Sequence, residues 1–246
     1  MKTRSRIGAS LAGGHTRLDC IRSCAPIHLR QTPDGVYLVG GAAGPLGGDD
    51  LLLEIEVEAG ATLVVRSAAA SLALPGSRRG PSTITVDARV APGATLHWLP
   101  EPVIAGGRCD HRIYNRLTLA PGASVVWRDE LVLGRRDEEP GRVESRIDAT
   151  VAGRPLLRNL LTVGPGTPGW DGPAVIGSAG AAGSLLVAGP KSPTGPFPAT
   201  ILGTTASILP LAGHGALASA LAADSLELRE LLDRAIELMT SQLVRG

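Results

Sequence analysis

A strand–turn–strand pattern returns about every thirty residues in this chain, and no other feature limits its possible folds as strongly. Each copy has a turn centred on Ala-Gly or Pro-Gly between two runs with strand character. The turn glycines are Gly60, Gly93, Gly122 and Gly153, at separations of 33, 29 and 31 residues. The copies cover residues 51–65, 83–98, 116–127 and 144–157, and residues 27–39 look like an earlier copy with its turn at Pro33-Asp34-Gly35. A repeat of this length is typical of stacked supersecondary units.

Apolar and polar residues alternate within the copies. The run from Leu53 to Glu58 alternates apolar residues with three glutamates, and residues 84–89 alternate in the same way. Such a period of two predicts strands with one buried face and one wet face. Pro92-Gly93 and Pro121-Gly122 fit the central positions of a type II turn. Because type II turns splay the strands of a hairpin, we expect them to lie in wider loops or to carry the chain from one sheet to another. The prediction is an antiparallel-rich β structure in two layers.

The last third of the chain changes character after Gly164. Glycine and proline dominate up to about residue 200, with a short strand predicted at 173–177 and another at 184–189. Asp224 is a good N-cap with Glu227 three residues later, and apolar residues then follow at helical spacing up to Met239. A weaker segment predicts a shorter helix from about residue 214. We therefore expect one domain over residues 1–246, with a β-rich body over about 20–200 and a C-terminal helical segment over about 214–244.

Composition excludes several classes of function. The chain of 246 residues has three tryptophans, two tyrosines, one phenylalanine and a formal net charge of +1. Stacking surfaces for single-stranded nucleic acid use several aromatic residues, and duplex binders carry a basic stripe, so no nucleic-acid partner is expected. No apolar run approaches the length of a membrane span, and the start of the chain is a poor secretory signal. Three cysteines do not form a disulfide framework, which favours the cytoplasm.

Sequence motifs for chemistry are weak. The string Gly164 to Gly169 matches G-x-G-x-x-G, but prolines and Trp170 follow where a dinucleotide site requires a helix. Cys109 and His111 would share one face of a strand, and nickel or zinc could use them, although a buried thiol beside a surface histidine is the ordinary alternative. Asp129 and Glu130 are neighbours, so in a strand they should face opposite ways and not form an acid–base pair. Catalysis is therefore unsupported.

The order of several motifs resembles the urease accessory protein UreD (UreH) family. In sequence these are APIHLRQ, GGAAGPLGGD, LLLEIEVEAGATLVVRSAAA, WLPEPVI, WRDELVLGR and GRPLLRN, from about Cys24 to about Pro190. The string G-G-x-x-G-P-x-G-G-D is the most specific element; its residues are Gly40, Gly41, Gly44, Pro45, Gly47, Gly48 and Asp49. The chain departs from the family where Lys-x-Tyr-Arg usually follows the AA strand and where Leu-Pro-Gln-Glu usually stands. These positions hold residues 71–75 and 99–102 here, which puts a polar lining inherited from them in doubt.

The resemblance implies a cytoplasmic, non-enzymatic helper of nickel insertion into urease. It implies binding to apo-urease and to the accessory protein UreF, and through UreF to the GTPase UreG, which brings nickel. It also implies a mainly β fold, a helical two-layer β superstructure of repeated β-turn-β units with one or two C-terminal α-helices.

A protein that passes Ni²⁺ on should hold it only transiently, with no tightly bound cofactor. Nickel favours imidazole and thiolate, so weaker carboxylates would let the ion leave. The acids that could line such a conduit are Glu101, Asp129, Glu130 and Glu139. The alternative interpretation of each is an ordinary charged residue on the surface. The Gly40–Asp49 run cannot be a phosphate cradle, because a strand follows where a helix is needed. We expect a rigid loop that joins sheet layers or meets a partner.

Two other classes of function stay open from the sequence alone. One is a carbohydrate-active enzyme on a β-solenoid, which would need an exposed cleft with clustered acids and aromatics. The other is a structural interaction protein unrelated to nickel.

Overall fold

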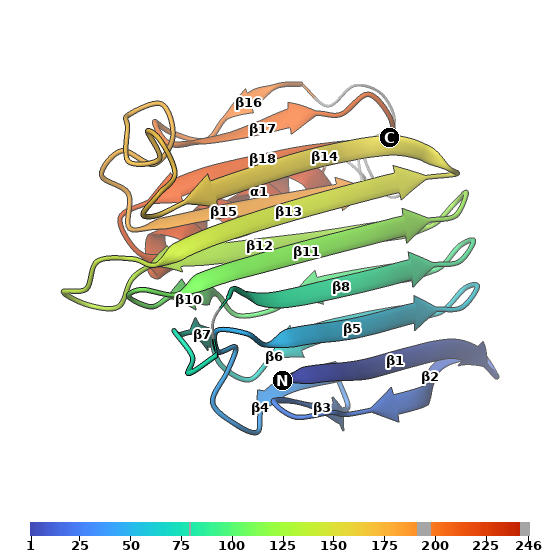
Figure 1. The fold of residues 1–246 in the computed structure, drawn as a ribbon. Coiled ribbons are helices and arrows are strands. Elements are labelled where there is room, and N and C mark those ends of the chain that lie inside the picture. The colour runs from blue at the N-terminus through green and yellow to red at the C-terminus, as the bar shows by residue number, and fades with distance from the viewer. Residues whose placement is uncertain (79, 191–197, 242–246) are drawn as a thin grey trace.

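Two β-sheets pack face to face, and one helix covers the outside of one of them (Figure 1). The computed structural model describes residues 1–78, 80–190 and 198–241. The mainly β, two-layer prediction is confirmed. In chain order the elements are β1 (Lys2–Ala12), β2 (His15–Arg22), β3 (Ile27–Thr32), β4 (Gly35–Gly40), β5 (Asp50–Val57), β6 (Thr62–Ser67), β7 (Ser71–Ala73), β8 (Ser82–Val90), β9 (Thr95–Leu99), β10 (Val103–Ala105), β11 (Asp110–Leu119), β12 (Ser124–Leu133), β13 (Arg142–Val151), β14 (Arg154–Val163), β15 (Ala181–Ala188), β16 (Thr200–Ile201), β17 (Ala206–Pro210), β18 (Gly215–Ala222) and α1 (Ser225–Ser241).

The two sheets differ in size. The front sheet has seven strands in the order β14-β13-β11-β8-β5-β1-β2. The back sheet has eleven strands, nine of them in the order β16-β17-β18-β15-β12-β9-β6-β4-β3, with β10 and β7 paired to the side of β12. From β4 to β13 the chain crosses repeatedly between the sheets, so that each coil adds one long strand to each layer, and two of the coils also add the short strands β7 and β10 to the back sheet.

The prediction of antiparallel pairing is wrong for this central region. Strands β1, β5, β8, β11 and β13 of the front sheet pair in parallel, and so do β4, β6, β9 and β12 of the back sheet. A strand leaves the front sheet through a turn and enters the back sheet, and the next front strand arrives one coil later in the same direction. Local alternation cannot reveal this pairing, because it is the same in parallel and antiparallel strands that have one buried face.

The turn glycines decide where the chain changes sheet. Gly60, Gly93 and Gly122 have φ values of 74°, 69° and 77°, and each turn closes with an N–H donated to the carbonyl three residues earlier, as Ala94 donates to Ala91 at 3.1 Å. This is type II geometry, which splays the strands and so sends the chain across to the other layer. At the fourth copy both Ala152 and Gly153 have positive φ, and β13 and β14 form an antiparallel hairpin within one sheet. The predicted fourth copy therefore ends the stack of coils.

Antiparallel strands also close the other end of the stack. Residues 27–39 form the β3–β4 hairpin within the back sheet, and β1 and β2 form a hairpin at the edge of the front sheet. The body thus begins at Lys2, well before the predicted start at about residue 20. Three glycines within residues 8–14 had hidden the strand pattern of this segment.

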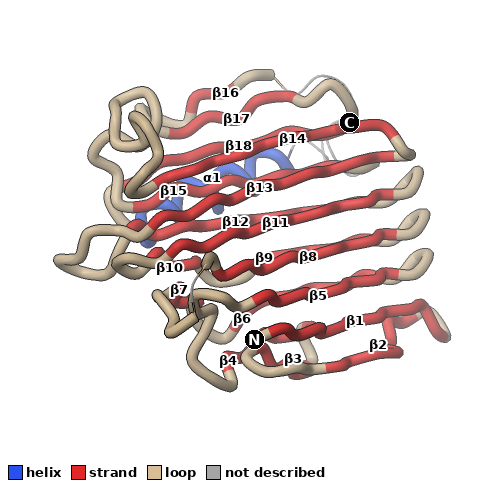
Figure 2. The backbone as a smooth tube through the Cα atoms, viewed as in Figure 1, coloured by secondary structure: helices blue, strands red, loops and turns tan. Residues whose placement is uncertain are grey.

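Among the described residues the C-terminal region contains one helix, in line with the expected one or two, but the weaker segment is not helical. Segment 215–222, predicted as helical, is the strand β18, and residues 173–177, predicted as a strand, form turns. Alanines at alternate positions of β18 pack under helix α1. These small residues, which led to the prediction of a helix, instead allow the helix and the sheet to pack closely. Helix α1 begins after Asp224, whose Oδ1 accepts the N–H groups of Leu226 and Glu227 at 2.9 and 3.0 Å. Its apolar side covers β12, β15 and β18, and the tube in Figure 2 shows it on this one face only.

Candidate functional site

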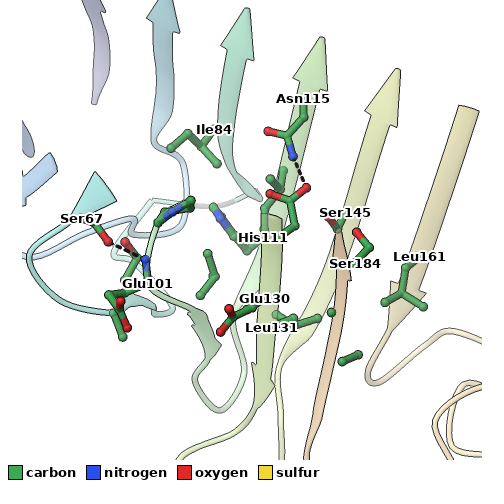
Figure 3. A pocket seen from close by; sticks show the side chains of 18 of the residues that line it. Ser67, Ile84, Glu101, His111, Asn115, Glu130, Leu131, Ser145, Leu161 and Ser184 are labelled. Carbon is green, nitrogen blue, oxygen red and sulfur yellow. Dashed lines mark hydrogen bonds between the residues drawn. The ribbon is translucent and has the colours of Figure 1, made fainter. Parts of the chain in front are cut away.

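A cavity of about 1070 Å³ lies between the two sheets. Its lining comes from β3, β4 and the loop after β4 at one end, and from β14, β16 and β17 at the other. Figure 3 shows some of the side chains that line it, among them Ile84, His111 and Leu131. Most lining side chains are apolar, including Leu51, Ile84 and Leu131. Polar groups interrupt this surface near its middle, where His111 and Asn115 on β11 face Asp129 on β12. The cavity therefore crosses the stacked coils and carries its main chemistry at their centre.

The Asp129 carboxylate lines this cavity and accepts hydrogen bonds from uncharged donors. Its Oδ2 accepts the Nδ2–H of Asn115 at 2.7 Å and the Nε1–H of Trp127 at 3.1 Å. The rings of Trp127 and Trp98 stack beside it with centroids 4.9 Å apart. Desolvation raises the pKa of Asp129 to about 6, although hydrogen bonds from Trp127, Asn115 and Trp98 oppose the rise. Near pH 7 the group is therefore an ionised carboxylate with no positive side chain among these hydrogen-bond donors.

Glu130 faces the opposite side of β12, as the sequence predicts. Its carboxylate accepts hydrogen bonds from Arg229 of α1 at 2.6 and 2.9 Å and lies 2.9 Å from Arg128 Nε. Glu101, in the connection after β9, also pairs with Arg229. Both glutamates are still among the lining residues, because residues 128–130 of β12 lie at a gap in the back sheet, between its pairing with β9 up to Trp127 and its pairing with β10 from Leu131. Each of the two is paired with Arg229.

The fourth candidate acid is elsewhere. Glu139 is exposed in the loop between β12 and β13 and lines a separate cavity of about 560 Å³. The structure thus places Glu101, Asp129 and Glu130 around one cavity and leaves Glu139 outside it.

Cys109 and His111 are not brought together as a metal site. Cys109 lines the smaller cavity, and His111 lines the larger one. His111 is 1% exposed, which contradicts a surface histidine, and its Nδ1 lies 2.8 Å from the Ser82 hydroxyl. Burial lowers the pKa of His111 to about 4 and raises that of the Cys109 thiol to about 11. Across residues 1–78, 80–190 and 198–241, no group of three or more His, Cys, Asp or Glu side chains is placed to hold a metal ion.

The glycine-rich loop from Gly40 to Asp49 joins the two layers, from β4 in the back sheet to β5 in the front sheet. Asp49 holds its shape, since its Oδ2 accepts the N–H of Leu46 at 3.0 Å and its other oxygen contacts the amino group of Met1. The N–H of Gly47 donates to the carbonyl of Leu74 at 3.1 Å. Residues 40 and 42–45 line the cavity, so this loop forms one of its ends.

Close backbone packing explains one glycine of this loop, and it predicts a specific sensitivity. A Cβ on Gly47 would lie 2.8 Å from the Gly76 nitrogen, whereas a Cβ on Gly40 would have nothing within 4 Å. Gly47→Ala should lower the free energy of unfolding by about 1–3 kcal/mol, the usual cost of overpacking. Gly40→Ala is the matched control and should stay within about 0.5 kcal/mol of the wild type. Urea unfolding measures both, and equal stability of the two variants would contradict the close contact.

Asp129 and His111 should give opposite contributions to the pH dependence of stability. Between about pH 4 and 6 the folded state retains the Asp129 proton that the unfolded state releases, so this group makes stability fall as pH rises. Between about pH 4 and 6.5 the unfolded state binds the His111 proton that the folded state excludes, so this group makes stability rise with pH.

Single substitutions separate the two contributions. Between pH 4 and 6 the slope of stability against pH should be more positive for Asp129→Asn than for the wild type, and less positive for His111→Gln. Each slope should differ from that of the wild type by up to about 1.4 kcal/mol per pH unit. Urea unfolding at half-unit pH steps gives these slopes. Parallel profiles for all three proteins would show that neither group titrates abnormally.

Some residues of the site were missed from the sequence. Asn115 shares the inward face of β11 with His111, Leu117 and Leu119, so a polar residue at an apolar position was the available signal. Arg128 and Arg229 gave no signal, since their partners are set by the packing of α1 on β12. In the described part of the chain, no helix is long and apolar enough to cross a bilayer.

Comparison with known proteins identifies relatives along the whole chain. A sequence model of the family described as UreD urease accessory protein matches residues 1–246. The urease accessory protein UreD of Streptomyces avermitilis is 45% identical over 243 residues, covering 96% of each chain. UreD 3 of Streptomyces griseus is 45% identical over 230 residues, 90% of each chain, and UreD of a Parafrankia species is 42% identical over 269 residues, 99% of this chain and 90% of its own. The chain therefore belongs to the UreD urease accessory protein family.

Proposed function

We propose that this chain is a cytoplasmic, non-enzymatic scaffold for urease maturation that passes nickel through its interior cavity. In this role it binds apo-urease and a UreF-like protein, and through the latter a UreG-like GTPase. Membership of the urease accessory family supports the maturation role. The observation that carries the nickel step is the Asp129 carboxylate, which neutral donors hold inside a cavity that crosses the stacked coils.

The chemistry of the cavity suits a passing cation. An ionised carboxylate attracts Ni²⁺, but a single oxygen donor binds nickel more weakly than imidazole or thiolate ligands do. His111 is uncharged near pH 7 and so does not repel the ion. The His111 ring is held at Nδ1 by the Ser82 hydroxyl, Glu101 and Glu130 are paired with Arg229, and most other lining residues are apolar. The ion would therefore exchange rapidly between Asp129 and the two ends of the cavity.

Substituting Asp129 tests this function. Cells that express urease with its accessory proteins, and this chain as Asp129→Asn, should show urease activity and urease nickel content reduced about tenfold or more, as expected for about 1.4 kcal/mol lost from the ion's interaction. Glu139→Gln is the matched control and should activate urease normally, because Glu139 lies outside the cavity.

Co-purification separates ion passage from assembly. The Asp129→Asn chain should still co-purify with the UreF-like protein and apo-urease, because the substituted group is inside the sandwich. Full urease activation by this variant would remove Asp129 from the path and the nickel step with it.

A further inference from the structure

A cluster of five charged residues fastens α1 to the back sheet beside the cavity. Arg229 of α1 binds Glu130 of β12 and Glu101 after β9, while Arg128 of β12 lies 2.9 Å from Glu130 and 3.1 Å from Asp233 of α1. Arg128 is 5% exposed and Glu130 6% exposed. Buried ions of this kind need partners, because an unpaired buried charge is strongly destabilising.

Arg229 occupies the point on which the two glutamates converge. Its Nη2 lies 3.2 Å from Glu101 Oε2 and 2.9 Å from Glu130 Oε2, so one nitrogen contacts both carboxylates. Its Nη1 lies 3.3 Å from Glu101 Oε1, and its Nε lies 2.6 Å from Glu130 Oε1. The guanidinium therefore engages all four carboxylate oxygens in bidentate pairs, which are the strongest form of this contact.

The positive charge of Arg229 is permanent. Desolvation lowers the pKa of Arg229, but the hydrogen bonds and charges of Glu130 and Glu101 outweigh that effect and raise it above the usual value. A guanidinium does not deprotonate in proteins, so its charge is permanent. Glu101 and Glu130 both line the cavity, and two convergent carboxylates without this counterion would be oxygen donors for a divalent cation.

We propose that Arg229 is a positioning residue that withholds Glu101 and Glu130 from the cation in the cavity, and so keeps the ion from being trapped beside α1. This inference rests on the proposed nickel passage. It divides the three cavity-lining acids into two kinds. Asp129 remains accessible to the ion, while Glu101 and Glu130 serve to hold α1 in place.

The test is nickel binding by the purified full chain at pH 7, measured by equilibrium dialysis with Ni²⁺ alone. Arg229→Met removes the charge and keeps the length of the side chain. Both Glu101 oxygens and Glu130 Oε2 then lose their hydrogen bonds to Arg229, while Glu130 Oε1 keeps its contact with Arg128 Nε. This variant should bind one additional Ni²⁺ per chain, at least about tenfold more tightly than the wild type binds any. Adding Glu101→Gln to it should abolish the gain.

Two controls separate the counterion role from a merely structural one. Arg229→Lys keeps a positive charge and should restore the wild-type stoichiometry. Arg234→Met removes an exposed arginine of the same helix and should bind nickel as the wild type does. Far-UV circular dichroism establishes that each variant is folded.

A folded Arg229→Met chain with wild-type nickel binding would overturn the inference. If that variant does not fold, Glu101→Gln alone decides. Unchanged nickel binding is expected, because Glu101 is already withheld, whereas reduced binding would overturn the proposal. These results are independent of urease activation: normal activation by Asp129→Asn would end the proposed passage, while unchanged binding by Arg229→Met would end this inference alone.

Discussion

Replacing Trp127 with alanine is expected to lower the free energy of unfolding by about 3–5 kcal/mol, the usual cost of truncating a buried tryptophan. Trp127 is 1% exposed and stacks on Trp98 at an interplanar angle of 17°. It belongs to the main core cluster, and its Nε1–H donates to Asp129. The loss therefore combines an internal void with a missing donor to a desolvated carboxylate. Because the free energy of unfolding of a domain is typically about 5–15 kcal/mol, this single change should remove a large part of the stability of the protein.

Trp127→Phe separates packing from hydrogen bonding. It keeps an aromatic ring beside Trp98 but removes the donor to Asp129, so the expected cost is about 1–3 kcal/mol. The loss of a donor that lowers the pKa of Asp129 should also move that pKa further upward. Urea unfolding followed by far-UV circular dichroism measures both variants without depending on tryptophan emission. A cost below about 1 kcal/mol for Trp127→Ala would mean that the stacked pair is not part of the packed core.

The second large effect concerns helix α1. Leu232 is fully buried where α1 packs on the back sheet, and Leu232→Ala should cost about 2–5 kcal/mol. Leu226 is the matched control, because it is a leucine of the same helix that is 68% exposed. Leu226→Ala should change stability by less than about 0.5 kcal/mol. Thermal and urea unfolding of the two variants give the comparison, and equal values would contradict the docking of α1.

The sequence specified the elements of this fold better than their pairing. Alternation from Leu53 to Val57 marks β5 and its buried face correctly, and Asp224 caps α1 as predicted. Strand partners were misassigned because a parallel partner lies about thirty residues away and leaves no local trace. The type II turns did contain the information, since a turn that splays two strands must deliver the chain to another layer.

The candidate site was predictable only in part. Asp129 and Glu130 were singled out as acids on opposite faces of one strand, and they do face opposite sides. Their different surroundings depend on contacts that are distant in sequence. Arg229 reaches Glu130 across 99 residues and Glu101 across 128, and nothing in the local pattern of α1 distinguishes it from an arginine on a solvated helix face.

The parallel stacking of the coils has a geometric consequence. Along the front sheet the cavity lining runs from Leu51 on β5 to Leu161 on β14, which spans five neighbouring strands. Four spacings of about 4.8 Å place these ends about 19 Å apart. Inserting or deleting one coil would lengthen or shorten the passage by one such step and leave both terminal hairpins intact. The number of coils therefore sets the distance between the Gly40–Asp49 loop and the end of the cavity at β14.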